Sequence, residues 1–135
     1  MTGIKRHTKV SDSLLKIVET STQPLAVKHI LHALKKKGLS PNKTTVYRLL
    51  DKLLEVGRLR MFYLKNGLRY YEFIDEKNHH HHHFFCKGCE GVFCLNHCPF
   101  DAANINTLLP NPGFSVDHHD FNLYGLCNAC ELKKA

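Results

Sequence analysis

The sequence lacks any long apolar run. No stretch approaches the roughly 20 apolar residues that a membrane-spanning helix needs, and the segment MTGIKRHTKVSDSLLK has no apolar core of the kind found in a signal peptide. We therefore expect a cytoplasmic protein without a membrane partner. An H-E-x-x-H motif and a recognisable nucleophile signature are also missing, which argues against an enzyme.

Acidic residues are scarce in the first half of the chain. Residues 1–74 carry 15 Lys and Arg against 5 Asp and Glu, a net charge of +10, whereas residues 75–135 carry 4 against 7, a net charge of −3. A basic domain gains affinity for nucleic acid by releasing counterions from phosphates. The first half is therefore expected to bind nucleic acid, the alternative being a basic surface that is only solvated.

Cysteine is absent from that same half, because all six cysteines lie in residues 75–135. The change of composition predicts two domains, residues 1–74 and 79–135, joined by a hinge at 75–78. The chain has 135 residues, 43% of them hydrophobic, which is enough for two small packed cores. The fold class that we expect is α+β.

Three helices are predicted for the first domain. The segment SDSLLKIVET indicates a helix that begins near Ser11 or Asp12, and residues 25–37 indicate a second. The third helix has Ser40 as its N-cap and Pro41 at its first position. Its buried stripe follows a helical spacing and consists of Val46, Leu49, Leu50, Leu53 and Leu54.

A hairpin is predicted to follow, because Asn66-Gly67 lies between two alternating, aromatic-rich runs. Helix, helix, helix, hairpin is the order of a winged helix, in which the third helix enters the major groove of DNA. The predicted DNA-binding residues on that helix are Lys43, Thr44, Tyr47, Arg48 and Lys52. The hairpin adds four cations for phosphates, namely Arg58, Arg60, Lys65 and Arg69. The alternative is a small helical domain whose charged residues only face water.

Two C-x-x-C pairs, CKGC and CNAC, dominate the second domain and supply Cys86, Cys89, Cys127 and Cys130. Four thiolates suit one tetrahedral Zn2+ ion. The pairs are separated by 37 residues, so the second pair must return on a distant strand. An iron–sulfur cluster and redox or disulfide chemistry remain alternatives. FFC and GVFC predict strands, residues 100–109 a helix and residues 114–126 a further strand, which together make a small α/β domain.

Histidines precede the first pair, at residues 79–83. Alternate residues of an extended segment face opposite sides, so His81 and His83 would face one site, and His80 and His82 another. Further potential ligands are Cys94, His97, Cys98, His118 and His119. A disordered His tract that scavenges metal is the alternative.

Together these motifs resemble the ferric uptake regulator family, which includes iron, zinc and peroxide sensors. TTVYRLLDKLLEVGRL is similar to the family's recognition helix, RYYEF to the end of its wing, HHHHHFFCKGC to its H-H-x-H-x-x-C-x-x-C segment, and HHDFNLYGLCNAC to its H-x-x-x-x-x-G-x-C-x-x-C ending. The resemblance covers nearly the whole chain. It implies a homodimer whose N-terminal winged helices bind double-stranded DNA at an AT-rich palindromic operator, and whose C-terminal domains dimerise.

The resemblance also implies metal ligands. The two C-x-x-C pairs match a structural Zn2+ site, and Tyr47 and Arg48 match the residues that approach bases. A regulatory site for Zn2+ or Fe2+ would use Glu72, His81, His83 and Cys94. A further metal site would use His80, His82, Asp101 and His119, with His82 standing where many members carry Asp. For His97 and Cys98 the resemblance offers no counterpart.

Two departures from the family pattern bear on the metal. Gln23 or Pro24 stands where many members place a His ligand, and Cys94 replaces a carboxylate. Thiolate with imidazole favours zinc over Fe(II). We therefore expect a metal-responsive repressor of the zinc uptake regulator type that controls metal homeostasis genes. The alternatives are an iron sensor, a peroxide sensor, a His-rich metal buffer and a zinc enzyme.

Overall fold

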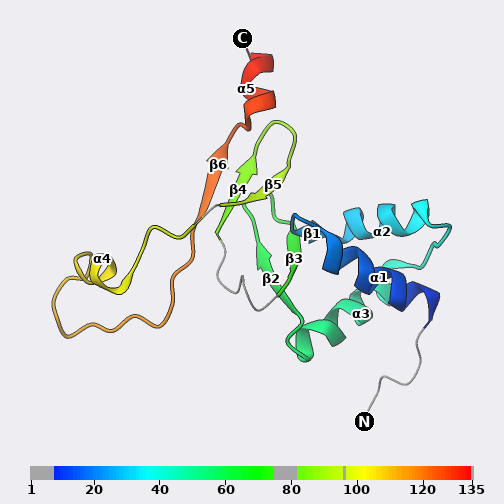
Figure 1. Ribbon diagram of the computed structural model, residues 1–135, viewed down its shortest axis with the longest axis horizontal. Helices are drawn as coiled ribbons and strands as arrows, with labels where there is room; N and C mark the ends of the chain where they lie inside the picture. The colour runs from blue at the N-terminus through cyan, green and yellow to red at the C-terminus, as the bar shows by residue number, and fades with distance from the viewer. Residues whose placement is uncertain (1–7, 75–81, 96, 135) are drawn as a thin grey trace. The chain divides into compact units, whose positions relative to one another are not determined.

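The computed structural model describes residues 8–74, 82–95 and 97–134, and the chain divides into two compact units, Met1–Lys77 and Asn78–Ala135. Each unit combines helices with a three-stranded sheet, as expected for an α+β fold (Figure 1). The predicted hinge at 75–78 lies outside the described residues. None of the helices in the described part of the chain combines the length and apolar character needed to cross a bilayer.

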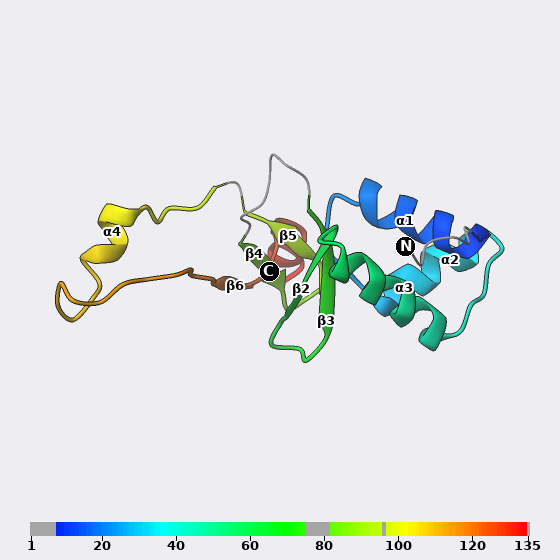
Figure 2. The ribbon, with the colours of Figure 1, turned by 90° about the horizontal axis from the view of Figure 1, so that it is seen from below.

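The first unit has the predicted order of three helices and a hairpin. Its elements are α1 (Lys9–Thr20), β1 (Leu25–Ala26), α2 (Val27–Lys36), α3 (Lys43–Glu55), β2 (Leu59–Tyr63) and β3 (Arg69–Phe73). The three strands form an antiparallel sheet in the order β1-β3-β2. Figure 2 shows the three helices on one side of the β2–β3 hairpin.

The helix starts differ from the prediction at three places. Helix α1 begins at Lys9, not near Ser11 or Asp12, because Thr8 caps it by accepting a hydrogen bond from the Ser11 backbone N–H. Asn42, not Ser40, caps α3, and its side-chain oxygen accepts a hydrogen bond from the Thr45 backbone N–H at 2.9 Å. Asn and Ser cap equally well, so the sequence contains two competing start signals, and Pro41 precedes the helix. The second predicted helix begins two residues late, because its first two residues pair with β3 as strand β1.

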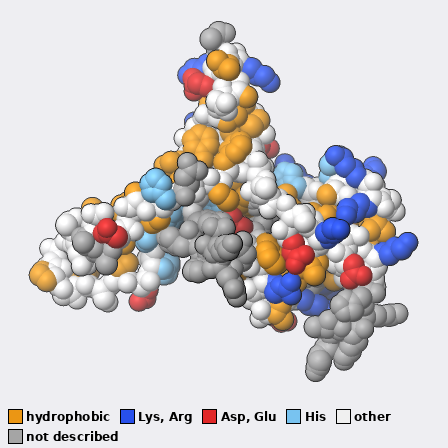
Figure 3. Space-filling view, viewed as in Figure 1, with side chains coloured by type: hydrophobic (Ala, Val, Ile, Leu, Met, Phe, Trp, Pro, Cys, Tyr) orange, Lys and Arg blue, Asp and Glu red, His pale blue; other side chains and the backbone are white. Residues whose placement is uncertain are grey.

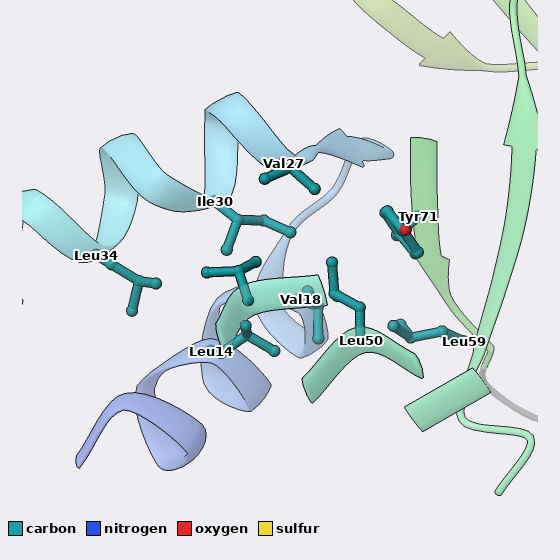
Figure 4. Close-up of a cluster of buried hydrophobic side chains, with 9 residues drawn as sticks. Leu14, Val18, Val27, Ile30, Leu34, Leu50, Leu59 and Tyr71 are labelled. Carbon is teal, nitrogen blue, oxygen red and sulfur yellow. The ribbon is translucent and has the colours of Figure 1, made fainter. Parts of the chain in front are cut away.

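The core of the first unit joins all three helices to the hairpin. Its buried side chains include Leu14, Ile30, Leu50 and Tyr71, none of them more than 1% exposed. Figure 4 shows these side chains pointing towards one another from α1, α2, α3 and the hairpin. The predicted stripe on α3 is confirmed, with Val46 and Leu50 fully buried and the other three members partly buried against the same cluster. The opposite face of α3 is therefore left to solvent.

The second unit is a small sheet with a long excursion. Its elements are β4 (His83–Cys86), β5 (Val92–Cys94), α4 (Ala102–Asn106), β6 (Asn122–Gly125) and α5 (Asn128–Lys134). The strand order is β5-β4-β6, with β4 antiparallel to β5 and parallel to β6. Residues 97–121, which contain α4, run out from the sheet and return to it (Figure 1).

Several predicted elements of this unit are shorter than expected. The helix predicted at 100–109 covers only Ala102–Asn106, and the strand predicted at 114–126 covers only Asn122–Gly125. A strand extends only as far as it has a partner, and four residues of β6 pair with β4. Helix α5, which follows the last strand, was not predicted.

The second unit has few buried apolar side chains. Among its described residues, only Phe85, Cys86 and Val92 belong to the buried hydrophobic set. Hydrophobic burial scales with apolar area, so a core of this size contributes little stability.

Candidate metal centres and nucleic-acid interface

The sheet of the second unit brings the two C-x-x-C pairs together. Strands β4 and β6 are parallel, so their carboxyl ends meet at one edge, with Cys86 opposite Gly125. Cys127 follows β6 directly, and Cys130 lies in the first turn of α5. The backbone N–H of Lys87 donates to the carbonyl of Gly125 at 2.7 Å and fixes the register there. Strand β6 is thus the distant strand that brings the second C-x-x-C pair beside the first.

The four sulfur atoms of this four-cysteine frame lie within 4.8 Å of one another. The distance between the sulfurs of Cys89 and Cys127 is 3.9 Å. Two thiolates bound to one tetrahedral zinc are separated by about 3.8 Å, since each Zn–S bond is about 2.3 Å long. All six cysteines of the chain are free thiols in the structure, so the disulfide alternative finds no support. The donor set therefore fits a zinc ion.

The electrostatics of the frame also favour a cation. The backbone N–H groups of Cys89 and Cys127 donate to the sulfur of Cys86, at 3.5 Å and 3.3 Å, and lower the pKa of its thiol to about 6. The neighbouring Cys86 sulfur holds the proton of Cys130 by a hydrogen bond and raises the pKa of that thiol to about 12. One thiolate therefore forms readily, and the others ionise when a metal replaces their protons.

Gly88 lets the CKGC turn approach the second pair. A Cβ atom at this position would stand 2.8 Å from the sulfur of Cys130 and 3.3 Å from a methyl carbon of Leu126. Real side chains do not tolerate such contacts, so the turn needs glycine for space. The glycine of CKGC was not singled out from the sequence, although its place between two ligands was visible.

His82 and His83 obey the predicted alternation. His83 lies directly opposite Cys94 in the β4–β5 ladder, so both side chains lie on one face of the sheet. A ring nitrogen of His83 and the sulfur of Cys94 are within 4.8 Å of each other. The ring of His82 instead stacks on Phe121, with centroids 3.9 Å apart. Two neighbouring residues thus serve two different groups of ligands.

The second group joins His82 and His119, as predicted, to Cys98, a potential ligand for which the family resemblance offers no counterpart. Nitrogen and sulfur atoms of His82, Cys98 and His119 lie within 4.8 Å of one another. Asp101 is not part of this group. Its carboxylate caps α4, where Oδ1 accepts from the Asn104 backbone N–H at 2.9 Å. His80 and His81 lie outside the described residues. His97 is exposed.

Glu72 lies in the first unit, near the end of β3. Its carboxylate is buried, 7% exposed, and an oxygen lies 3.7 Å from the guanidinium nitrogen of Arg60 on β2. Its role as a metal ligand stays a prediction.

The outer face of α3 carries all five predicted DNA-binding residues. Lys43, Thr44, Tyr47, Arg48 and Lys52 are exposed. The first turn of α3 contains no acidic residue, so the positive end of its dipole is available to a phosphate. On the face drawn in Figure 3, Lys and Arg side chains lie over the helices of this unit. The structure thus leaves these five side chains exposed on one face of α3, and their contact with DNA stays a prediction.

The arginines of the hairpin are engaged within the protein more than expected. The guanidinium of Arg58 lies 3.3 Å from a carboxylate oxygen of Glu19, and Arg60 pairs with Glu72. Arg69 donates to the hydroxyls of Tyr63 and Tyr71, at 3.3 Å and 3.1 Å, and its guanidinium lies over the ring of Tyr47. These hydrogen bonds raise the pKa of Arg69. Arg69 therefore links the hairpin to Tyr47 on α3.

Comparison with known proteins finds one family. The model of the "Ferric uptake regulator family" matches residues 2–124. The ferric uptake regulation protein of Staphylococcus epidermidis is 30% identical over 131 residues, which cover 97% of this chain and 89% of that protein. Members of the ferric uptake regulator family are DNA-binding transcription regulators and not enzymes.

Solved structures show the same fold. The ferric uptake regulator from Francisella tularensis with iron is similar with a TM-score of 0.77 and 23% identity, covering 97% of this chain and 98% of that one. A zinc uptake regulator complexed with zinc and DNA is similar with a TM-score of 0.62 and 26% identity, covering 96% and 87%. These likenesses confirm an N-terminal winged helix followed by a domain of the dimerisation type. The chain therefore belongs to the ferric uptake regulator family of metal-responsive, DNA-binding transcription regulators.

Proposed function

We propose that the protein is a zinc-responsive repressor of metal homeostasis genes. The observation that carries this proposal is the pair formed by His83 and Cys94, which lie opposite each other on one face of the β4–β5 ladder. A thiolate beside an imidazole is a donor pair that zinc prefers, whereas Fe(II) prefers carboxylate and imidazole. The similarity to a zinc uptake regulator supports the same choice of metal.

The regulatory ion takes its ligands from Glu72, His81, His83 and Cys94. The four-cysteine frame holds a separate, structural zinc, because four thiolates leave no open coordination position and bind too tightly to follow a changing supply. Metal at the mixed ligands favours the DNA-binding form of the protein by the difference in its affinity for the two forms. The sensing and structural roles thus fall to different donor sets.

The DNA partner is an AT-rich palindromic operator, bound in the cytoplasm by a homodimer. Two copies of α3 reach two half-sites when the protein has two-fold symmetry. Apolar side chains of the second unit that support a dimer are exposed in the single chain, among them Leu108 (69%), Phe114 (52%) and Leu123 (47%). Exposed apolar residues in a unit with so small a core are covered when a second copy binds.

The test is an operator shift assay on protein that keeps its structural zinc. Zn2+ and Fe2+ are titrated separately, without oxygen, and operator affinity is measured at each metal concentration. The proposal expects zinc to raise operator affinity at lower free concentrations than iron. If iron alone raises the affinity, the protein is an iron sensor, a reading that the Staphylococcus relative favours. If neither metal acts, metal sensing is wrong.

Replacing Cys94 tests whether its thiol causes the preference for zinc over Fe(II). The family's acidic residue is restored by Cys94→Glu, which should shift the response from zinc towards Fe(II). Cys89→Ser serves as the control variant, because it damages the structural frame and should lower DNA binding with both metals equally. A Cys94→Glu protein with an unchanged metal preference would show that Cys94 does not bind the regulatory ion.

A further inference from the structure

A second group of ligand atoms lies in the unit that contains the four-cysteine frame. The sulfur of Cys98 is 3.2 Å from Nε2 of His119, and the rings of His82 and His119 stack with centroids 5.1 Å apart. All three side chains offer an atom within 4.8 Å of the others. These residues come from three separate places, the start of β4 and the two ends of the excursion at 97–121.

Aromatic rings surround this group, and one of its histidines is buried. His82 is only 3% exposed, and its ring lies 3.9 Å from that of Phe121. Phe100 meets both His119 and Phe121 edge-on, at 5.6 Å and 5.5 Å. Buried imidazoles occur mainly where a hydrogen-bonding partner or a metal compensates the cost of burial. An aromatic wall also fixes the direction of each ring, as a metal site requires.

The distances suit a tetrahedral ion. Bonds of about 2.0 to 2.1 Å to nitrogen and 2.3 Å to sulfur place the two donors about 3.6 Å apart. The 3.2 Å between Cys98 and His119 needs only a small outward adjustment. Three protein ligands leave one coordination position open, which a water or a fourth residue can fill.

We propose that His82, Cys98 and His119 bind one divalent ion of the zinc class, with the Cys98 thiolate in the place that the family resemblance gave to Asp101. Asp101 is exposed and caps α4, so its carboxylate already has a structural partner. A thiolate with two imidazoles selects zinc or cobalt against Fe(II) and Mn(II). This proposal rests on the proposed function only for the class of metal. Its test measures metal binding and uses no DNA.

Binding at this position has a structural consequence. Cys98 and His119 are the two ends of the excursion that exposes Leu108 and Phe114. An ion held by both, and by His82 at the start of β4, closes the excursion at its base. Closing a loop with a metal removes conformational freedom from both ends at once. The ion therefore stabilises the excursion rather than the sheet.

The experiment is a Co2+ titration of the full chain with its structural zinc in place. A Cys94→Ser background is used, so that Cys98 is the single thiol outside the four-cysteine frame. Thiolate bound to Co2+ gives a near-ultraviolet charge-transfer band, and tetrahedral Co2+ gives strong visible bands. We expect both bands to appear, and we expect Cys98→Ser to abolish the first and to weaken binding by at least about 100-fold, more than loss of an outer hydrogen bond costs.

Two matched controls isolate the ligands. His118→Ala changes the exposed neighbour of His119 and should leave the cobalt spectrum unchanged, whereas His119→Ala should remove it. Asp101→Asn keeps an N-cap for α4 and removes the carboxylate, so it too should leave the spectrum unchanged. The proposal is overturned if Cys98→Ser keeps the charge-transfer band, or if Asp101→Asn weakens cobalt binding as much as Cys98→Ser does.

A measurement on the unmutated chain covers the case in which Cys98→Ser does not fold. Zinc at this site should slow the alkylation of Cys98 by iodoacetamide at least about tenfold, because the metal-bound thiolate is a poorer nucleophile than the free one. Mass spectrometry of the peptide that carries Cys98 gives the rate with and without added Zn2+. Equal alkylation rates with and without Zn2+ would refute the proposal. This outcome would not change the result expected of the operator assay, which tests the proposed function.

Discussion

Gly88 provides the sharpest test of the four-cysteine frame. Replacing it by alanine adds a single methyl group to the CKGC turn, and that carbon would lie 2.8 Å from the sulfur of Cys130 and 3.0 Å from its Cβ. Carbon and sulfur atoms in contact prefer separations of about 3.5 to 4.0 Å. The new methyl must therefore push Cys130 or its own turn away by roughly 0.7 Å or more.

The size of the effect follows from how little a zinc site can move. Ligand distances in such sites hold to within about 0.2 Å, so a displacement of this size strains the bond to Cys130 or breaks it. Overpacking by one methylene costs about 1 to 3 kcal/mol. Gly88→Ala should accordingly weaken zinc binding by about 5- to 150-fold, at 1.4 kcal/mol for each factor of ten.

The assay is competition for zinc against a coloured chelator, with the released metal measured at equilibrium. Gly113→Ala is the control, because the nearest atom to its added methyl is the amide oxygen of Asn111 at 3.2 Å, the end of a side chain in an exposed loop. That variant should hold zinc as the unmutated protein does. Zinc affinity unchanged in Gly88→Ala would mean that Cys130 is not fixed by a metal, and the frame as described would be wrong.

Three further predictions concern the two units. Leu50→Ala, at a fully buried position of the first core, should lower the free energy of unfolding by about 2 to 5 kcal/mol in a urea titration. Tyr47→Ala on the exposed face of α3 should lower it by no more than about 1 kcal/mol, through loss of the contact with Arg69, and should lower operator affinity instead. Burial raises the pKa of Tyr71, so above its ordinary value of 10.0 the unfolded chain loses this proton before the folded chain does; stability should fall as the pH rises past 10, and Tyr71→Phe should flatten that fall. Chelation of the structural zinc should unfold the second unit while the first keeps its helical circular dichroism signal, because the cluster from Leu14 to Tyr71 includes no residue of the second unit; loss of both signals together would contradict two independent cores.

The features that were predictable from the sequence are those with strong local signals. The stripe on α3 repeats over three turns, and the two C-x-x-C pairs are recognisable without any structure. The start of α3 was wrong because Ser40 and Asn42 are both good caps, and only the fold of the whole unit selects between them. Helix α5 was missed because seven residues after a cysteine pair carry too little periodicity.

The role of Cys98 shows the limit of reasoning from spacing. It lies 21 residues before His119 and has no C-x-x-C partner, so no local motif marks it as a ligand. It meets the two histidines only because the excursion leaves the sheet after β5 and returns before β6. Asp101 was the natural choice from resemblance, but helix capping holds its carboxylate. Ligands that a long connection brings together can be identified only once the fold is known.

The distribution of thiols explains why we favour zinc over iron throughout the protein. Each of the six cysteines lies beside other metal-ligand atoms, four of them in the frame, Cys94 beside His83 and Cys98 beside His119. Each mixed group pairs imidazole with one thiolate. In both groups the thiolate takes the place that the family resemblance gave to a carboxylate, which shifts the metal preference from iron towards zinc. Oxidation of Cys94 removes a ligand of the proposed regulatory ion, so the response to zinc should be lost under oxidising conditions and return on reduction. A zinc response that persists after Cys94 is oxidised would assign the regulatory ion to histidine and carboxylate ligands alone.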